Sequence, residues 1–152
     1  MKKIITILAL FLMVSMPMAS ADIVSDLDNR IDEYNENAEY VPSYLQSLLG
    51  DEVIKLVIVT DEGNERYIKA VTEDSYITTF EEVDEDTEFD ASMVVGLNEA
   101  TARTILSSSD PLNEFIAAKD NEEIVIEPVG LINTVKYTVA NVVMQVSSLF
   151  GF

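Results

Sequence analysis

The chain has 152 residues, a formal net charge of −19 at pH 7, and no histidine, cysteine or tryptophan. These absences exclude catalytic sites built on a histidine base or a cysteine nucleophile, and metal sites built on imidazole or thiolate ligands. The negative charge repels nucleic acid and anionic lipid headgroups at long range, so we expect neither as a partner.

The sequence also lacks a nucleophile-elbow motif, a glycine-rich phosphate loop and a dinucleotide-binding fingerprint. Pairs of carboxylates can perform acid–base catalysis. However, with 28 acidic residues in the chain, such pairs occur by chance and carry no information without geometry. We therefore predict a protein that is not an enzyme and has no cofactor.

Residues 1–21 have the order of a secretory signal peptide. Lys2 and Lys3 precede the apolar stretch Ile4–Val14, and Ala19–Ala21 forms a small-residue cleavage site. The alternative is an uncleaved anchor, although the apolar stretch is short for a membrane span. Cleavage removes two of the 9 basic residues and leaves 7 against 28 acidic ones, a formal charge of −21. We predict a secreted protein, without lipidated cysteine or disulfides, whose residues 22–152 form a single domain.

The mature chain begins with apolar residues at helical spacing among acidic ones. This pattern predicts an amphipathic helix over residues 22–38 that packs on the domain, with the stripe Ile23, Leu27, Ile31 and Tyr34. Residues 43–49 follow as a short helix that Gly50 ends.

Three consecutive strands are predicted next. Residues 53–60 are apolar on both faces except for Lys55, which is typical of a central strand covered on both sides. Short turns separate this segment from residues 65–72 and 76–83, whose alternation indicates further strands. The three together predict a meander.

Residues 81–90 contain seven acidic side chains, and two interpretations are available. Asp84, Asp86 and Glu88 alternate as in a calcium-binding loop. However, Phe89 stands where such a loop needs glycine, and Val95 stands where it needs its final glutamate. We therefore predict a solvated crossover loop and no metal site.

The next segment reads as strand, helix, helix, strand. Alternation over residues 89–97 predicts a half-buried strand. Asn98 is a suitable N-cap for a following helix, and Asp110 caps a second one with Pro111 at its first position. Residues 123–127 then predict a short strand at a sheet edge.

The C-terminal residues 131–150 predict one amphipathic helix. Nine apolar side chains share an arc of about 120° when projected as a helix: Leu131, Ile132, Val135, Val139, Val142, Val143, Val146, Leu149 and Phe150. The helix is long enough to span a membrane, but its other face is polar. Two alternatives remain: the helix packs over the sheet, or it forms a lid over an apolar cavity and makes peripheral contact with a membrane.

The order of these elements resembles the sterol carrier protein (type two) family. The most specific part is Leu106–Gly130, in which Asp110-Pro111-Leu112 restarts a helix, Phe115-Ile116 follow, and a charged turn leads to Glu123–Ile126. Phe89–Leu97 resembles the preceding strand of the family, and the resemblance covers roughly residues 25–150.

The resemblance implies an α+β fold in which helices cover a five-stranded, mostly antiparallel sheet of order 3-2-1-4-5. It also implies a cavity between sheet and helices that takes a fatty acyl, sterol or isoprenoid lipid. By position, the cavity would be lined by Phe89, Ala91, Met93, Val95, Ile105, Phe115, Val139 and Val143. Two alternatives remain open: a protein-interaction module of the same fold with a filled core, and an acidic surface protein that binds cations through residues 84–90.

Overall fold

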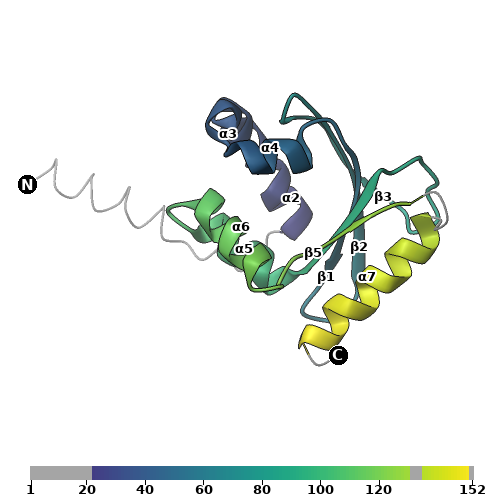
Figure 1. Cartoon of the computed structure of the whole chain (residues 1–152). Helices are drawn as coiled ribbons and strands as arrows, with labels where there is room; N and C mark the ends of the chain where they lie inside the picture. Colours follow the sequence, from purple (N-terminus) through teal and green to yellow (C-terminus); the bar gives the residue numbers. More distant parts are fainter. Residues whose placement is uncertain (1–21, 131–134, 151–152) are drawn as a thin grey trace, which may run out of the picture.

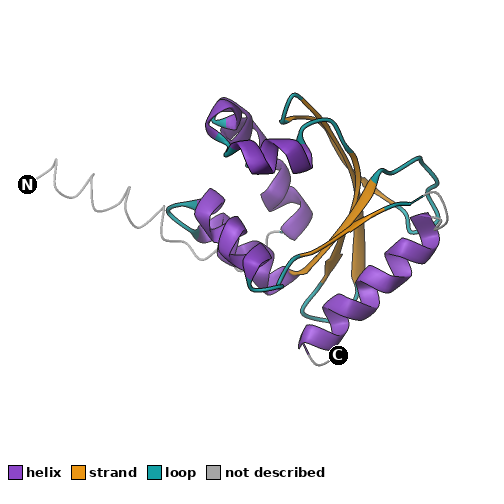
Figure 2. Ribbon diagram, in the orientation of Figure 1, coloured by secondary structure: helices purple, strands orange, loops and turns teal. Residues whose placement is uncertain are grey.

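The structure, a computed structural model, describes residues 22–130 and 135–150. Over these residues the chain forms one five-stranded sheet with helices on both of its faces (Figure 1; Figure 2). The strands are β1 (Val53–Val59), β2 (Glu65–Glu73), β3 (Tyr76–Val83), β4 (Met93–Asn98) and β5 (Val125–Pro128). Their spatial order is β3-β2-β1-β4-β5, with β1 and β4 parallel and the other neighbours antiparallel. The predicted fold class and strand order are confirmed.

The helices divide between the two faces of the sheet. On one side lie α2 (Ile23–Asp28), α3 (Ile31–Glu36), the 3₁₀ turn η1 (Ala38–Tyr40), α4 (Ser43–Leu49), α5 (Glu99–Ser107) and α6 (Pro111–Asp120). Among the helices of the described residues, α7 (Val135–Phe150) is the one on the other side (Figure 1). We call the two sides of the sheet the helical face and the α7 face.

The two faces follow from the alternation of side chains along each strand. In β1, Ile54, Leu56 and Ile58 point to the helical face and join the core that α2, α5 and α6 complete. Val57 and Val59 point to the α7 face and join a second core with α7. Because both faces are covered, β1 is apolar on both sides, as its sequence predicted.

The predicted N-terminal helix is divided in two at Asn29–Arg30. The first part, α2, contacts α5, whereas the second part, α3, contacts the edge strand β3. The Tyr34 hydroxyl donates to the Ser75 carbonyl at 2.9 Å, and the Asn35 amide pairs with both the N–H and the carbonyl of Ile77 at 2.8 and 2.9 Å. The two parts on either side of the break therefore pack against different elements. The amide of Asn35 also occupies edge groups of β3 that would otherwise be open to another strand.

The crossover loop lies on the α7 face, and β4 starts later than predicted. The Nζ atom of Lys55 donates to the carbonyls of Glu85 and Thr87 at 3.1 and 3.3 Å, and the Phe89 ring lies over Lys55 with its centroid 5.6 Å from Nζ. Burial lowers the pKa of Lys55. Strand β1 begins at Val53, so the residues before Ser92 have no partner on that strand, and Phe89 turns down onto the sheet instead.

An ion pair holds α2 against α5. The carboxylate of Asp26, 6% exposed, lies 3.0 Å from Nη1 of Arg103, whose Nη2 lies 2.7 Å from Glu99. A buried carboxylate needs such a partner because leaving it uncompensated costs several kcal/mol.

We expect the substitution Arg103→Met to lower the free energy of unfolding by about 2 kcal/mol, because it removes the guanidinium from beside the buried Asp26. The value is below that of a fully buried pair because the Arg103 side chain is one-third exposed. Urea unfolding at pH 7 measures the change. The control is Arg30→Met, which removes an exposed pair with Glu33 and should cost less than about 1 kcal/mol. Equal losses in the two variants would contradict the stabilising role of the buried pair.

Candidate functional site

The helical face of the sheet is not completely filled. Between it and the helices that cover it lies a cavity of about 610 Å³. This volume is within the range of roughly 300–1,000 Å³ that is typical of small-molecule sites.

The walls of the cavity are predominantly apolar. The sheet provides the floor from β1 and from the strands on both sides of it: Ile54, Leu56, Ala70, Ile77, Phe80 and Val95. The helices provide the opposite wall: Leu27, Ile31, Ile105, Leu106, Leu112 and Phe115. Ile126 of the edge strand β5 completes the lining on that side.

Several of these side chains are only half-buried although they lie between the sheet and the helices. Leu56, Phe80, Ile105 and Phe115 belong to this group. Apolar side chains in such a position are normally fully packed, because protein interiors reach crystal-like density. Their residual exposure therefore marks the space that an apolar guest would fill.

The polar groups deep in the cavity are already engaged. The Thr72 hydroxyl accepts from the backbone N–H of Glu52 at 3.0 Å, and the Tyr34 hydroxyl donates to Ser75. Burial raises the pKa of Tyr34, so this phenol stays neutral over the physiological range. In the part of the chain that the structure describes, no buried side-chain polar atom lacks a partner, and no three acidic side chains gather as metal ligands. The deep wall thus offers shape and apolar contact without reactive groups.

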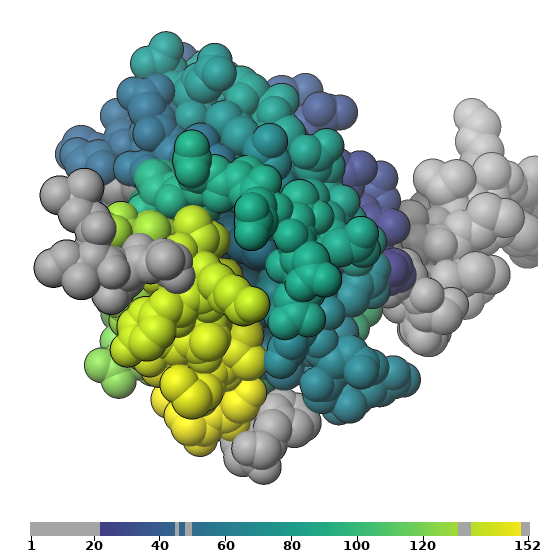
Figure 3. Space-filling model, turned by 90° about the vertical axis from the view of Figure 1, so that its right-hand side faces the viewer, coloured from purple at the N-terminus to yellow at the C-terminus, as the bar shows by residue number. Residues whose placement is uncertain are grey.

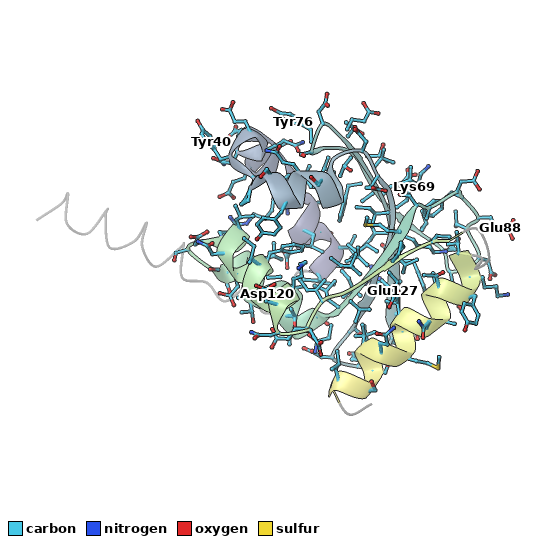
Figure 4. All side chains as sticks on the ribbon, in the orientation of Figure 1. Tyr40, Lys69, Tyr76, Glu88, Asp120 and Glu127 are labelled. Atoms are coloured by element: carbon cyan, nitrogen blue, oxygen red, sulfur yellow. The ribbon has the colours of Figure 1, made fainter. Side chains whose placement is uncertain are left out.

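The mouth of the cavity is polar and lies between α3 and the α5–α6 turn. Its lining residues are Arg30, Glu33, Asn37, Tyr40, Ser109 and Asp110. Arg30 spans the mouth: its Nη1 lies 2.5 Å from Glu33, and its Nη2 donates to the Leu106 carbonyl at 3.2 Å. Tyr40 is 73% exposed and lies at the end of the molecule formed by α3 and α4 (Figure 4).

The structure brings three of the residues predicted to line the cavity onto its wall. These are Val95, Ile105 and Phe115. Met93 points to the helical face and is buried in the core there. Ala91 is buried in the segment that leads into β4. Neither of the two is part of the lining.

The other three predicted residues lie on the α7 face, which corrects their expected position. Phe89 covers Lys55 and Lys69 there, while Val139 and Val143 pack in the second core. Figure 4 shows Lys69 and Glu88 on this side of the sheet. Figure 3 views the molecule from the same side, and α7, in yellow, lies there beside the teal and green residues from the middle of the sequence. The cavity and α7 are therefore separated by the sheet.

Of the two alternatives for the C-terminal helix, α7 therefore adopts packing over the sheet, and it does not cover the cavity. An apolar arc shows that a helix packs on an apolar surface, but both faces of this sheet are apolar. The decisive residue is Gly96 of β4, whose side-chain position points to the α7 face. An ideal Cβ there would overlap Cγ1 of Val142 and lie 3.0 Å from Cγ2 of Val146. Only glycine allows α7 to approach β4 this closely.

Sequence reasoning missed most of the wall. Leu27 and Ile31 were predicted in a packing stripe, and Leu56 and Phe80 lie in segments predicted as strands, without assignment to a cavity. Their patterns locate a face but do not show whether it is filled. Only the arrangement of α2, α3, α5 and α6 around the floor reveals the empty volume.

No protein-family model and no curated protein matches the sequence. Among solved structures, the chain is similar to a conserved hypothetical protein of Thermus thermophilus described as a candidate sterol carrier protein (11% identity, TM-score 0.45, 89% of this chain and 88% of the other). It is also similar to sterol carrier protein 2 like 2 of Aedes aegypti (10% identity, TM-score 0.42, 81% and 98%). A third is a ubiquinone synthesis protein described as UbiJ-SCP2 (10% identity, TM-score 0.41, 84% and 92%). These descriptions carry the family name that the sequence resemblance predicted. All three TM-scores are below 0.5.

Proposed function

We propose that this protein is a non-enzymatic binder or carrier of an apolar ligand, held in the cavity on the helical face. The observation that supports the proposal is a space of about 610 Å³ whose deep walls are apolar and whose mouth is polar. Each methylene group of a guest moved from water into such walls contributes about 0.8 kcal/mol. Fatty acyl, sterol and isoprenoid lipids all belong to the ligand class that these walls accept.

Binding without catalysis agrees with the chemistry of the walls. A catalytic site needs a group with an available proton or lone pair beside the reacting atom. The hydroxyls of Tyr34 and Thr72 are instead bonded to the backbone, and the remaining deep lining is hydrocarbon.

The two alternative functions have less support. A protein-interaction module with a filled core requires packed side chains where the described residues enclose a cavity. A cation-binding surface requires ligands that converge, but in residues 22–130 and 135–150 no three acidic side chains form such a group.

The cellular location remains part of the proposal. The predicted signal peptide at residues 1–21 lies outside the described residues, and secretion rests on its sequence pattern. None of the helices in the described part of the chain is long and apolar enough to cross a membrane. Contact of α7 with a membrane surface stays a prediction. It is compatible with an exposed Tyr137 and Met144 and with a helix that has no acidic residue.

Native mass spectrometry of protein purified from its host tests the proposed function. We expect species heavier than the polypeptide by the mass of a lipid, and their loss after extraction with organic solvent. The delipidated protein should then take up a fluorescent fatty alcohol with one-to-one stoichiometry. A protein that carries no lipid and takes up neither a fatty alcohol nor a fatty acid nor a sterol probe would not be a carrier.

A further inference from the structure

The charged groups at the mouth of the cavity define the headgroup that a ligand can present there. The deep lining ends at α3 and at the α5–α6 turn, and the charged side chains among the lining residues are Arg30, Glu33 and Asp110. A ligand whose chain occupies the apolar part places its polar end beside these three side chains. The inference below rests on the proposed function and concerns the chemistry of that polar end.

The single cation of this group is already engaged on two sides. Arg30 makes an ion pair with Glu33 at 2.5 Å and donates to the Leu106 carbonyl at 3.2 Å. A guanidinium recognises a carboxylate best when two of its N–H groups are available in parallel. Here Nη1 and Nη2 are each bonded to a different partner, so Glu33 competes with an incoming carboxylate for this guanidinium.

The acidic side chains add repulsion to this competition. Asp110 caps α6 by accepting from the N–H of Asn113 at 3.3 Å, and it stays at the mouth because the cap holds it there. Glu33 and Asp110 outnumber Arg30, and the whole chain carries a charge of −19. A negative headgroup therefore meets a negative field both locally and at long range.

We propose that the cavity selects single-chain lipids with an uncharged headgroup, such as fatty alcohols and monoacylglycerols, over fatty acid anions of the same chain length. An uncharged hydroxyl headgroup can donate to Glu33 or Asp110 and accept from Asn37 without breaking the Arg30–Glu33 pair. The apolar wall holds the chain of either lipid equally, so the discrimination arises at the mouth.

Competition binding at pH 8 tests this selection. Monopalmitoylglycerol and palmitate, each below its critical micelle concentration, displace a fluorescent fatty alcohol from the delipidated full chain. We expect palmitate to bind at least tenfold more weakly at low ionic strength. The difference should shrink in 0.5 M salt, because screening weakens interactions between exposed charges.

The decisive readout is the change, from one variant to another, in the ratio of the palmitate and monopalmitoylglycerol dissociation constants. Differences in solubility between the two lipids are the same for every variant, so they cancel in this comparison. The double substitution Glu33→Gln and Asp110→Asn removes both acids and keeps a capping side chain at α6. We expect palmitate binding to improve about tenfold relative to monopalmitoylglycerol binding in this variant, whose Gln and Asn side-chain oxygens can still accept from a hydroxyl headgroup. Adding Arg30→Gln should abolish the improvement, because the freed guanidinium provides it.

The matched control is Asp61→Asn with Glu62→Gln, which makes the same change in net charge in the β1–β2 turn, outside the cavity lining. Its ratio should equal that of the unchanged protein. Two results would overturn the selection while leaving the carrier function in place. The first is a ratio near one in the unchanged protein. The second is an equal change of the ratio in the Glu33→Gln, Asp110→Asn variant and in the control. Failure of both lipids to displace the probe would overturn the selection together with the proposed function.

Discussion

Replacing Ala70 by phenylalanine is expected to weaken the binding of a fluorescent fatty alcohol at least tenfold while the protein stays folded. Ala70 lies on the floor of the cavity in β2, between Ile54 of β1 and Phe80 of β3. A benzyl group there occupies space that the ligand chain would otherwise use. Loss of burial for only two methylene groups is about 1.6 kcal/mol, which is roughly fifteenfold in affinity.

The stability of this variant distinguishes a filled cavity from a damaged core. Inserting a large side chain into a packed core costs about 1–3 kcal/mol. In an open cavity the same side chain gains contacts, so we expect the free energy of unfolding to stay equal or to rise. The control Val71→Phe changes the next residue of β2, which points to the α7 face, and should leave the probe affinity within twofold. Loss of binding in both variants, or a large loss of stability in Ala70→Phe, would contradict the assigned position of the cavity.

Replacing Gly96 by alanine is expected to lower the free energy of unfolding by about 2–3 kcal/mol. The added Cβ would overlap Cγ1 of Val142, a side chain that is 0% exposed. Alanine is otherwise better suited than glycine to the interior of a strand, by about 0.5–1 kcal/mol. A net loss of stability therefore measures how closely α7 packs on β4. Chemical denaturation followed by circular dichroism provides the measurement.

A double-mutant cycle assigns this loss to the contact with Val142. Val142→Ala alone should cost about 1–3 kcal/mol through the cavity it leaves. In the double variant, the Cβ at position 96 enters that space. The combined loss should then be smaller than the sum of the two single losses by about 1–2 kcal/mol. Strict additivity would show that α7 does not pack over Gly96. Probe affinity should be unchanged in the folded Gly96→Ala variant, because the sheet separates α7 from the cavity.

Local features of the chain were predictable because each depends on a few neighbouring residues. Asn98 and Asp110 cap α5 and α6 as expected, by accepting from Thr101 and Asn113. The edge position of β5 and the central position of β1 also follow from local patterns, in the second case from apolar residues on both faces. The strand order agrees with what the family resemblance implied.

The remaining features depend on contacts between distant segments. Nothing local shows that α7 chooses the face opposite the other helices, since its valines could pack on either side of an apolar sheet. Phe89 alternates like a strand residue, but the parallel neighbour β1 begins only at Val53 and offers it no partner. Asn29–Arg30 interrupts the N-terminal helix because α2 and α3 have different partners. The empty volume itself is a property of the assembled walls, and no stretch of sequence encodes it.

The central claim is that an apolar ligand occupies the helical face and not the α7 face. Isotope-filtered NMR tests it most directly, with monopalmitoylglycerol bound to protein whose Ile, Leu and Val methyl groups are labelled. We predict contacts between the lipid chain and the methyl groups of Leu56, Ile105 and Ile126, which line the cavity. We predict none with Val142 and Val146, which α7 buries against the opposite face of the sheet. Lipid contacts confined to the α7 valines, or no contacts at saturating lipid, would contradict the account.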